Sequence, residues 1–320
     1  MFHSDSTVPK HARSVWSMRS RCTQMDSNPS DPYPPDAGHS RMIRPKLMQV
    51  PKRQRCSAMT LPEVLVVMAS VAFLVALLLP AVQSARESAR RLGCANNMRS
   101  IGCALYGHLL VRRAFPVGCL EWKSPGVSST KRCLSWNAII LPWLEEQATF
   151  DRLDYQKPFD DPANATVAAT AIPVFACPSA DRRGQPVGGL GGTDYGGVVG
   201  ERITSVNNPE KGVIVNEKSY APREIADGLS KTILVAECAA EIWPDGQWIN
   251  GRNLFDQAYS INAKLSFWED EMRSRHPTGA QCLAGDGSVH LLSEMVDKAI
   301  LAAACTRAKG ESPAAPWVTQ

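Results

Sequence analysis

The sequence predicts an α+β protein in which one long N-terminal helix, first transmembrane and then amphipathic, packs on an antiparallel β-sheet head with short helices. Three observations support this fold class: an apolar stretch near the N-terminus, an amphipathic stretch directly after it, and then short apolar runs separated by frequent Gly and Pro. The corresponding segments are a leader (1–58), a transmembrane helix (59–82), its amphipathic continuation (83–115), a head (116–311) and a loose tail (312–320).

The composition fits a globular body preceded by a basic segment. The chain has 320 residues and is 44% hydrophobic, which allows a substantial core. Residues 1–58 contain ten basic and four acidic residues, whereas the rest contains 25 basic and 27 acidic residues. Because the body is slightly acidic, we expect no nucleic-acid partner. The leader has no sustained periodicity, so we expect disorder there, and we favour a translation start at Met42 or Met48.

The apolar stretch predicts a membrane span. Residues 64–82 are nineteen residues without a formal charge, and a helix of this length spans about 29 Å. A cleaved secretory signal is the competing interpretation, but the stretch is longer than such signals and continues as helix over 84–110. Five cations and no acid lie in 44–58, which favours a cytoplasmic N-terminus, although Arg86, Arg90 and Arg91 on the other flank leave the orientation open on charge alone.

Three residues of this helix are unusual for a simple anchor. A carboxylate at Glu63 is costly near a bilayer unless it is paired or interfacial, so we expect it to have a function. Pro62 is tolerated because the first helical turn has no backbone donors to lose. Pro80 lies inside the helix and should kink or locally melt it.

The run AMTLPE (58–63), after basic residues and before an apolar helix, resembles the processing site of type IV pilins and type II secretion pseudopilins. The resemblance implies a pilin-like fold and a prepilin peptidase that cuts before Met59 and methylates the new N-terminus. It also implies that Glu63 pairs with the N-terminal amine of a neighbouring subunit, and that Pro80 matches a proline of many pilins. Ala58 replaces the usual Gly, Met59 the usual Phe and Pro62 an aliphatic residue, yet we expect cleavage to survive.

Later motifs are similar to those of a large family of pilin-like planctomycete proteins, a domain of unknown function with a C-terminal H-x9-DG motif. The motifs occur in the family's order over roughly 56–311: LLLPAVQSARESARR (77–91), CANNM (94–98), LPWLE (141–145), FACPS (175–179), DYGGVVG (194–200), IADGLSKTI (225–233), and His276 followed by Asp286-Gly287. Because that family is largely uncharacterised, the resemblance implies architecture more than activity.

Short patterns predict the elements of the head. Apolar runs predict strands over 212–215, 232–236, 281–284 and 288–292, with a tight turn at Asp286-Gly287 between the last two. Helices are predicted over 139–150 and 295–306, and a helical turn over 225–231. The Gly-rich stretch 188–200 lacks the order of a phosphate loop, so we expect no nucleotide site.

The candidate chemistry is sparse. We expect His276 and Asp286 to have structural roles, because their spacing fits a loop leading into a hairpin whose turn Asp286 shapes. Without HExxH or GxSxG, no catalytic site, metal or cofactor is expected. The sequence has no EF-hand spacing. A calcium site is nevertheless kept as an alternative, because acids occur near loops at Asp160, Asp161, Asp194, Asp227 and Asp286.

Eight cysteines follow residue 58, and no CxxC motif occurs. An extracytoplasmic head permits disulfides, and Cys119 with Cys133, which flank a polar loop, is our best local pairing. Several of the others are expected to be small buried hydrophobic residues.

These observations favour a structural protein over an enzyme. We expect a single-pass subunit of the inner (cytoplasmic) membrane, N-methylated at Met59, with its head periplasmic or at the cell surface. Its partners would be the prepilin peptidase, the lipid bilayer and like or related pilin subunits, with which it would form a pilus-like or secretion-related fibre. The alternative is a membrane-anchored extracytoplasmic enzyme or carbohydrate-binding module that uses His276, Asp286 and the tryptophans Trp243, Trp248 and Trp268.

Overall fold

The computed structural model describes residues 59–124, 126, 130–182, 185–205, 211–239, 245–263, 271–310 and 317. The chain divides into two units, Met1–Met59 and Thr60–Gln320. The predicted leader and almost all of the predicted tail lie outside the described residues. All helices and strands named below belong to the second unit.

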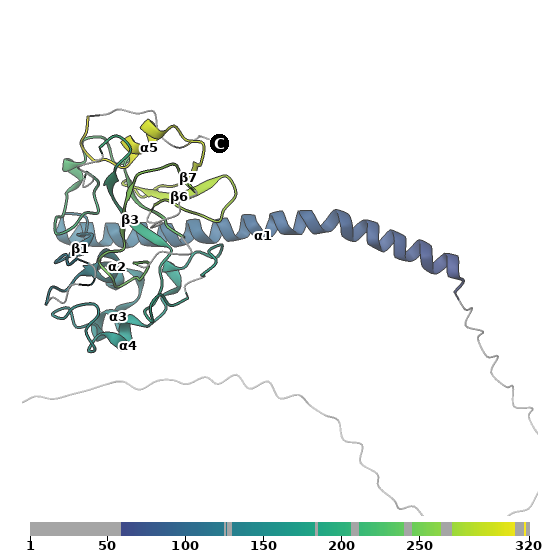
Figure 1. Cartoon of the computed structure of the whole chain (residues 1–320), viewed down its shortest axis with the longest axis horizontal. Coiled ribbons are helices and arrows are strands. Elements are labelled where there is room, and N and C mark those ends of the chain that lie inside the picture. Colours follow the sequence, from purple (N-terminus) through teal and green to yellow (C-terminus); the bar gives the residue numbers. More distant parts are fainter. Residues whose placement is uncertain are drawn as a thin grey trace, which may run out of the picture. The chain divides into compact units, whose positions relative to one another are not determined.

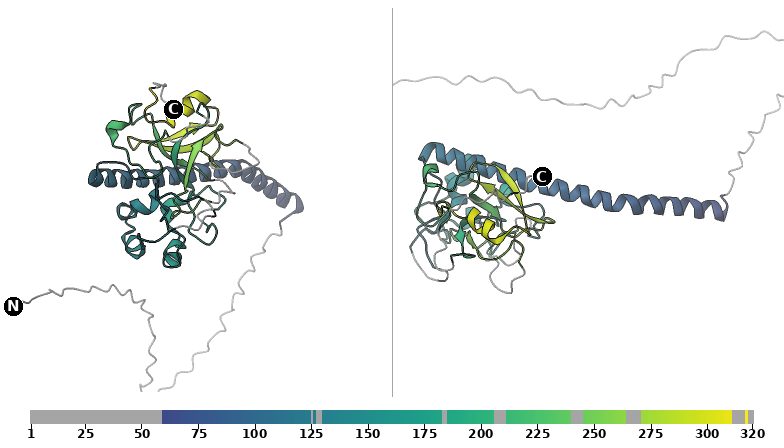
Figure 2. Two further views of the ribbon diagram at one scale, coloured as in Figure 1. Left: turned by 60° about the vertical axis from the view of Figure 1, so that its left-hand side comes forward. Right: turned by 90° about the horizontal axis from the view of Figure 1, so that it is seen from above.

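Helix α1 (Leu61–Arg112) is 52 residues long and confirms the prediction of one long N-terminal helix. Thr60, just before it, is extended, and its backbone N–H donates to the Glu63 carboxylate at 2.8 Å, which caps the first turn. The helix ends at Arg113, whose left-handed conformation (φ 63°) lets its N–H donate to the Leu109 carbonyl. Figures 1 and 2 show α1 as a rod that extends well beyond the head.

The two halves of α1 have different surroundings. Every residue over 59–86 is exposed. Among the described residues, α1 is the one helix long and apolar enough to cross a membrane. From Cys94 onward one face is covered by the head, and Met98 and Leu105 are fully buried. The helix continues through Pro80 without the predicted local melting, because a proline removes a single backbone hydrogen bond, and the ribbon curves over its exposed half (Figure 1).

The head contains a five-stranded sheet in the order β5-β3-β4-β6-β7. The strands are β3 (Tyr195–Glu201), β4 (Ile233–Glu237), β5 (Leu254–Gln257), β6 (Gly279–Ala284) and β7 (Val289–Ser293). The pairs β3–β4, β4–β6 and β6–β7 are antiparallel, as predicted, but β5 is parallel to β3. The sheet is therefore mixed. After β4 the chain crosses to the outer side of β3 instead of forming a hairpin, and this crossover makes β5 parallel to β3.

The local predictions of a strand over 212–215 and of a single helix over 139–150 are wrong. Residues 212–215 form bends and an isolated bridge instead of a strand. The helix predicted over 139–150 is divided by Pro142, which cannot continue the backbone ladder, and by Glu145, which is left-handed (φ 62°). The result is three pieces: α2 (Trp136–Ile140), the 3-10 helix η1 (Leu141–Leu144) and α3 (Gln147–Arg152).

Short elements complete the head. The helix predicted over 295–306 is present as α5 (Lys298–Ala304), whose first turn is capped by the Asp297 side chain. The helical turn predicted over 225–231 is instead a series of turns in which Gly228 has φ 98°. The remaining elements are β1 (Cys119–Leu120), β2 (Leu134–Ser135), α4 (Ala165–Ala168), η2 (Pro173–Phe175) and η3 (Pro222–Glu224).

The second half of α1 is part of the head core. It lies between two groups of elements, with β6, β7 and α5 on one side and α2, α3 and α4 on the other (Figures 1 and 2). It contacts η1, β6, η2 and β7 directly. Its buried face joins the largest core cluster, which also contains Trp136, Phe175 and Trp248.

Candidate functional site

A buried polar cluster lies where α1 meets the head. It consists of Cys94 on α1, Cys177 after η2, Glu237 at the end of β4 and His276 before β6. All four residues are buried, and one potential ligand atom from each lies within 4.8 Å of the others. Cys94 and Cys177 form a disulfide with their Cα atoms 5.3 Å apart. These four residues are called the junction cluster below.

His276 connects the members of the junction cluster. Its Nδ1 lies 2.7 Å from Glu87 Oε1, and its Nε2 lies 3.3 Å from Glu237 Oε1 and 3.8 Å from Cys177 Sγ. Burial alone lowers the pKa of His276, but the hydrogen bonds and negative charges of Glu237 and Glu87 outweigh it and raise the pKa above its ordinary value. The imidazole therefore bridges α1 and the sheet through two carboxylates.

Both carboxylates are held by further contacts. Glu237 is fully buried, and its Oε2 accepts the Gln281 backbone N–H at 2.9 Å. Glu87 on α1 accepts from Arg90 Nη2 at 2.6 Å. Burial alone raises the pKa of Glu87, but the hydrogen bonds and charges of His276 and Arg90 lower it below its ordinary value. The two acids are thus oriented toward the imidazole from opposite sides of the interface.

A second layer of contacts positions the loop that carries Cys177. Asp194 Oδ2 accepts the Cys177 backbone N–H at 2.9 Å, and its Oδ1 lies 3.1 Å from Arg182 Nη2. Burial raises the pKa of Asp194, although Arg182 opposes the shift. From α1, Asn97 donates to the Ala176 carbonyl at 2.8 Å. Both α1 and the start of β3 therefore hold this loop in place.

The residues of the H-x9-DG pattern do not form one site. Asp286 and Gly287 make the tight turn between β6 and β7, where Gly287 has φ 85°. Asp286 Oδ1 accepts the Ser288 backbone N–H at 2.9 Å, as a turn-forming side chain does. Within the described part of the chain, no hydrogen bond joins Asp286 to His276, whose ring faces the junction cluster instead.

The predicted Cys119–Cys133 disulfide is absent, and both residues are buried thiols with their sulfur atoms 3.6 Å apart. The β1–β2 register pairs Cys119 with Ser135, so Cys133 is its diagonal neighbour. Cys133 lies just before β2 in a left-handed conformation (φ 46°), outside the regular strand pairing. The bond that does form, Cys94–Cys177, joins residues 83 positions apart.

The predicted processing residues lie at the start of α1. Ala58 is outside the described residues, whereas Met59 is exposed and precedes the helix. Glu63 is exposed in the first helical turn, and its carboxylate accepts a hydrogen bond from the Thr60 backbone N–H. The bond predicted to be cut therefore does not interrupt α1.

Of the three tryptophans considered for sugar binding, the structure describes Trp248, which offers no exposed ring for stacking. Trp248 is fully buried, and its Nε1 donates to the Thr170 carbonyl at 2.8 Å. Trp243 and Trp268 lie outside the described residues.

The loop acids considered for calcium each have their own protein partners. Asp160 pairs with Lys123, and Asp161 accepts the Ala163 backbone N–H. Asp227 accepts backbone N–H groups of the segment after α5, and Asp194 and Asp286 have the contacts given above. In the described segments, these five acids form no shared ligand group, and the one group of three or more potential ligands is the junction cluster.

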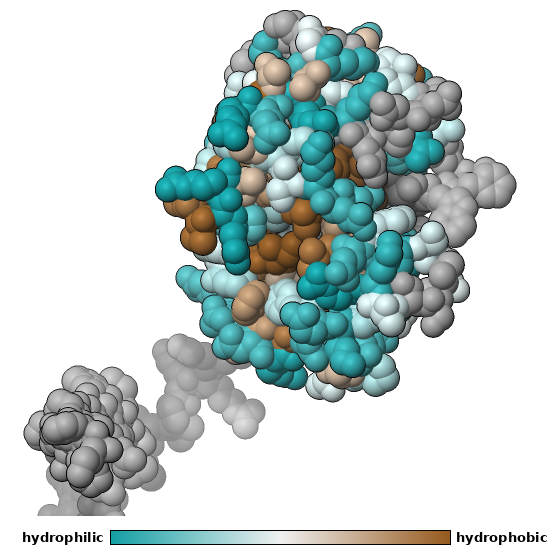
Figure 3. All heavy atoms as spheres, turned by 90° about the vertical axis from the view of Figure 1, so that its left-hand side faces the viewer, coloured by the Kyte–Doolittle hydropathy of each residue, from teal (hydrophilic) through white to brown (hydrophobic). Residues whose placement is uncertain are grey.

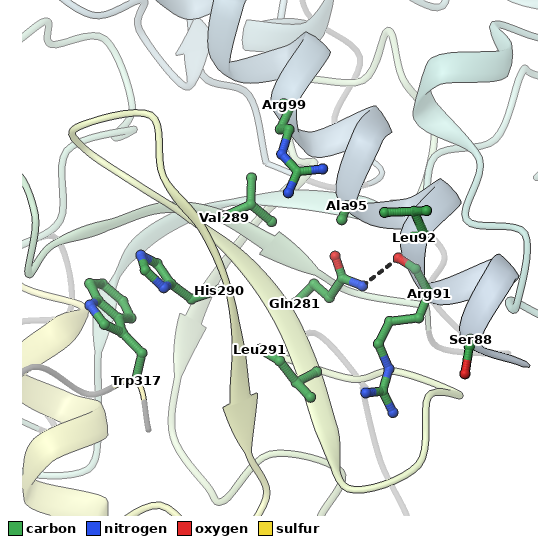
Figure 4. Close-up of a pocket in the computed structure, with 10 residues that line it drawn as sticks. All are labelled: Ser88, Arg91, Leu92, Ala95, Arg99, Gln281, Val289, His290, Leu291 and Trp317. Atoms are coloured by element: carbon green, nitrogen blue, oxygen red, sulfur yellow. Dashed lines mark hydrogen bonds between the residues drawn. The ribbon is translucent and has the colours of Figure 1, made fainter. Parts of the chain in front are cut away.

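A surface pocket of about 470 Å³ adjoins the junction cluster between α1 and the β6–β7 hairpin (Figure 4). Gln281 forms part of its lining, and its side chain donates to the Arg91 carbonyl at 2.7 Å. At the other end His290 stacks on Trp317, with ring centroids 4.1 Å apart. The pocket contains none of the four cluster residues, but the Gln281 backbone N–H holds Glu237 directly behind it.

A smaller pocket of about 320 Å³ lies where α1 ends, lined by His108, Trp143 and Tyr155 among others. Figure 3 looks onto this end of the head and shows a hydrophobic patch surrounded by hydrophilic residues. Burial lowers the pKa of His108, which favours its neutral form. This end of the head is thus an apolar surface at the opposite end of α1 from the exposed half.

Sequence reasoning singled out His276 but missed its partners Glu87, Cys94 and Glu237. Glu87 and His276 are 189 positions apart, so no local spacing reveals the pair. A signal was nevertheless present, because Glu87, Cys94 and Cys177 all lie inside motifs that carried the family resemblance.

Comparison with known proteins identifies a family without a known function. No curated protein and no solved structure matches the chain. Residues 83–299, well over half of the chain, match a family described as "Protein of unknown function (DUF1559)". The matched range contains Glu87 and the whole junction cluster. This chain therefore belongs to the DUF1559 family of proteins of unknown function.

Proposed function

We propose that this protein is a membrane-anchored structural subunit of pilin or pseudopilin type, with its head outside the cytoplasm. The observation that carries the proposal is the division of α1 into two halves. Residues 59–86 are exposed and mostly apolar, whereas from Cys94 onward the same helix belongs to the head core. One continuous element would therefore serve both as the anchor and as part of the head.

The exposed half of α1 is unsuited to water. Fifteen large hydrophobic side chains over 59–82 are exposed. Covering one such side chain is worth about 1.5–3 kcal/mol, so the set strongly favours a bilayer or neighbouring apolar helices. The uncharged run within it spans about 29 Å, close to the thickness of the hydrocarbon core.

The polar side chains at Ser70 and Glu63 are satisfied within the helix. Ser70 Oγ donates to the Val66 carbonyl at 2.8 Å. In the first turn, the Glu63 carboxylate accepts a hydrogen bond from the Thr60 backbone N–H. A lipid environment requires such internal pairing, because it offers no water to replace it. Residues 64–82 are therefore compatible with lipid on all sides.

Processing and assembly are the finer parts of the proposal. The chain would be cut before Met59 by a prepilin peptidase and methylated on the new α-amine. In an assembly of like or related subunits, Glu63 would exchange its bond to Thr60 for the α-amine of a neighbouring Met59. The basic residues over 44–55 favour a cytoplasmic N-terminus in the inner membrane, and the role is structural, not catalytic.

The N-terminus of the mature protein tests the proposal. Full-length protein is expressed in a host with a prepilin peptidase, purified from membranes and examined by intact mass and peptide mass spectrometry. We expect N-methylated Met59 as the first residue, and a retained leader in Ala58→Trp. An uncut chain, or a cut after residue 82, would contradict the proposal.

Assembly is tested separately by subunit cross-linking in membranes. Glu63→Gln should be processed normally but lose cross-linked products, because its carboxylate can no longer pair with an amine. Glu145→Gln, an exposed position on the head, is the matched control and should keep both processing and cross-linking.

A further inference from the structure

The geometry points to a second chemical state of the junction cluster: we propose that it binds one Zn²⁺ ion when its disulfide is reduced. The two sulfurs of Cys94 and Cys177, the Glu237 carboxylate and the His276 imidazole would be the ligands. This inference concerns the head and does not depend on the membrane role proposed above.

Three of the four donor atoms already have nearly the separations of a tetrahedral site. Zinc bonds of about 2.0–2.3 Å place neighbouring ligand atoms about 3.3–3.8 Å apart around a tetrahedron. In the structure His276 Nε2 lies 3.3 Å from Glu237 Oε1 and 3.8 Å from Cys177 Sγ. Cys177 Sγ lies 3.6 Å from the same Glu237 oxygen. Three edges of the tetrahedron are therefore present, and opening the S–S bond supplies the room for the ion.

Contacts behind the ligands orient them as metal sites require. A histidine ligand commonly donates its second ring N–H to a carboxylate, which leaves the other nitrogen free for the ion. Glu87 occupies this position, 2.7 Å from His276 Nδ1. In the same way the Gln281 N–H holds Glu237 Oε2 and leaves Oε1 facing the sulfurs.

The disulfide alone does not account for its polar surroundings. A disulfide is uncharged and needs no ionic partner, yet the side chains of Glu237 and His276 are both completely buried against it. Burying a carboxylate is costly unless a cation accompanies it. In the reduced state Zn²⁺ would balance the charge of the two thiolates and bind the Glu237 carboxylate directly, while the His276 imidazole would keep its contact with Glu87.

The two states exclude each other because they use the same sulfur atoms. Reduction transfers two electrons and two protons from an external dithiol, which itself becomes a disulfide, and yields thiols at Cys94 and Cys177. Zn²⁺ then displaces both thiol protons into solvent and binds the two thiolates. The disulfide ties α1 to the Cys177 loop, and the ion would also tie it to β4 and to the segment before β6. Two sulfur donors favour zinc over calcium or magnesium.

A cobalt titration tests the proposal. Full-length protein in detergent is reduced with dithiothreitol, freed of it under nitrogen and titrated with Co²⁺. We expect one Co²⁺ per chain, with a thiolate-to-cobalt charge-transfer band and the intense d–d absorption of a tetrahedral site, both removed by Zn²⁺. The oxidised protein should show neither. Cys177→Ser should weaken the charge-transfer band, and Glu87→Gln should lower the affinity about 10- to 100-fold while preserving the spectrum.

The second sulfur pair provides a matched control. Cys119 and Cys133 are also buried and close together, so the double variant Cys119→Ser/Cys133→Ser should leave the titration unchanged. The proposal is overturned if reduced wild-type protein gives no tetrahedral thiolate spectrum, or if the control abolishes that spectrum and Cys177→Ser does not. Circular dichroism monitors the fold, and unfolding on reduction without recovery by Co²⁺ also counts against a metal site.

Discussion

Glu87 is the residue at which α1 passes from its exposed half to the half that packs in the head. It is the first residue of the helix that the head partly covers, and it contacts both Arg90 on its own helix and His276 in the head. A contact to His276 at 2.7 Å is possible only when one particular face of α1 meets the sheet. This single carboxylate therefore helps to set the rotation of the helix about its own axis.

Glu87→Gln should lower the free energy of unfolding of the oxidised protein by about 1.5–3 kcal/mol, the range for a hydrogen bond to a charged group. Gln preserves the size and an acceptor, but it removes the charge that stabilises the buried imidazole. Urea unfolding followed by tryptophan fluorescence measures the change. Glu145→Gln on the exposed head surface should shift the same quantity by less than about 0.5 kcal/mol. Equal unfolding curves for the two variants would show that the Glu87 charge contributes nothing.

The candidate site was only partly predictable at the level of residues. His276 could be singled out because it belongs to a recognisable motif, but its role depends on partners that the fold brings together. Glu237 gives no local sign of burial, since an acid after an apolar run usually marks the end of a strand at the surface. The Cys119–Cys133 interpretation failed for a related reason: sequence proximity brings the two sulfurs within 3.6 Å, but a disulfide also requires a specific backbone geometry that local spacing does not encode.

At the scale of elements, the packed half of α1 supplies the buried apolar face of the helix–head interface. Met98, Ile101 and Leu105 follow one another at spacings of three and four, and all are completely buried. On the other side of the same helix, Leu110 is 69% exposed. The helix therefore has one face that stabilises the head and one that does not.

Leu105→Ala should reduce the free energy of unfolding by about 2–5 kcal/mol, because it removes buried methyl groups and leaves a cavity. Leu110→Ala, the same substitution on the exposed face of the same helix, should have almost no effect. Both are measured by urea unfolding in detergent. A similar loss for both variants would mean that the exposed face is also covered, by a partner or by detergent.

The long helix and the last hairpin were predicted from local signals, whereas elements that depend on distant pairing were not. The long helix and the β6–β7 hairpin follow from periodicity and from a turn that needs a glycine at positive φ. Strand β3 contains Gly196, Gly197 and Gly200, whose weak strand propensity conceals a fully buried strand. The parallel pairing of β5 with β3 is set by a crossover that no local pattern encodes.

At the scale of the whole molecule, the segment proposed to cross the membrane and the core of the head share one helix, so the proposed anchor cannot be separated from the fold of the head. The disulfide from Cys94 to Cys177 and the Glu87–His276 contact both lie near the start of the packed half. They hold the helix at the point where a force on the anchor would first reach the head.

Membrane attachment should therefore depend on the exposed half of α1 and not on apolar surface elsewhere. Phe73→Arg/Leu77→Arg places two charges near the middle of the apolar run, each costing about 2.5–3.5 kcal/mol in the bilayer. We expect this variant to be lost from carbonate-washed membranes. Leu110→Arg/Val111→Arg is the matched control, since both side chains are exposed at the far end of the same helix, and it should stay in the membrane. Retention of both variants would show that residues 59–82 are not in lipid, whereas loss of both would place the attachment in the head.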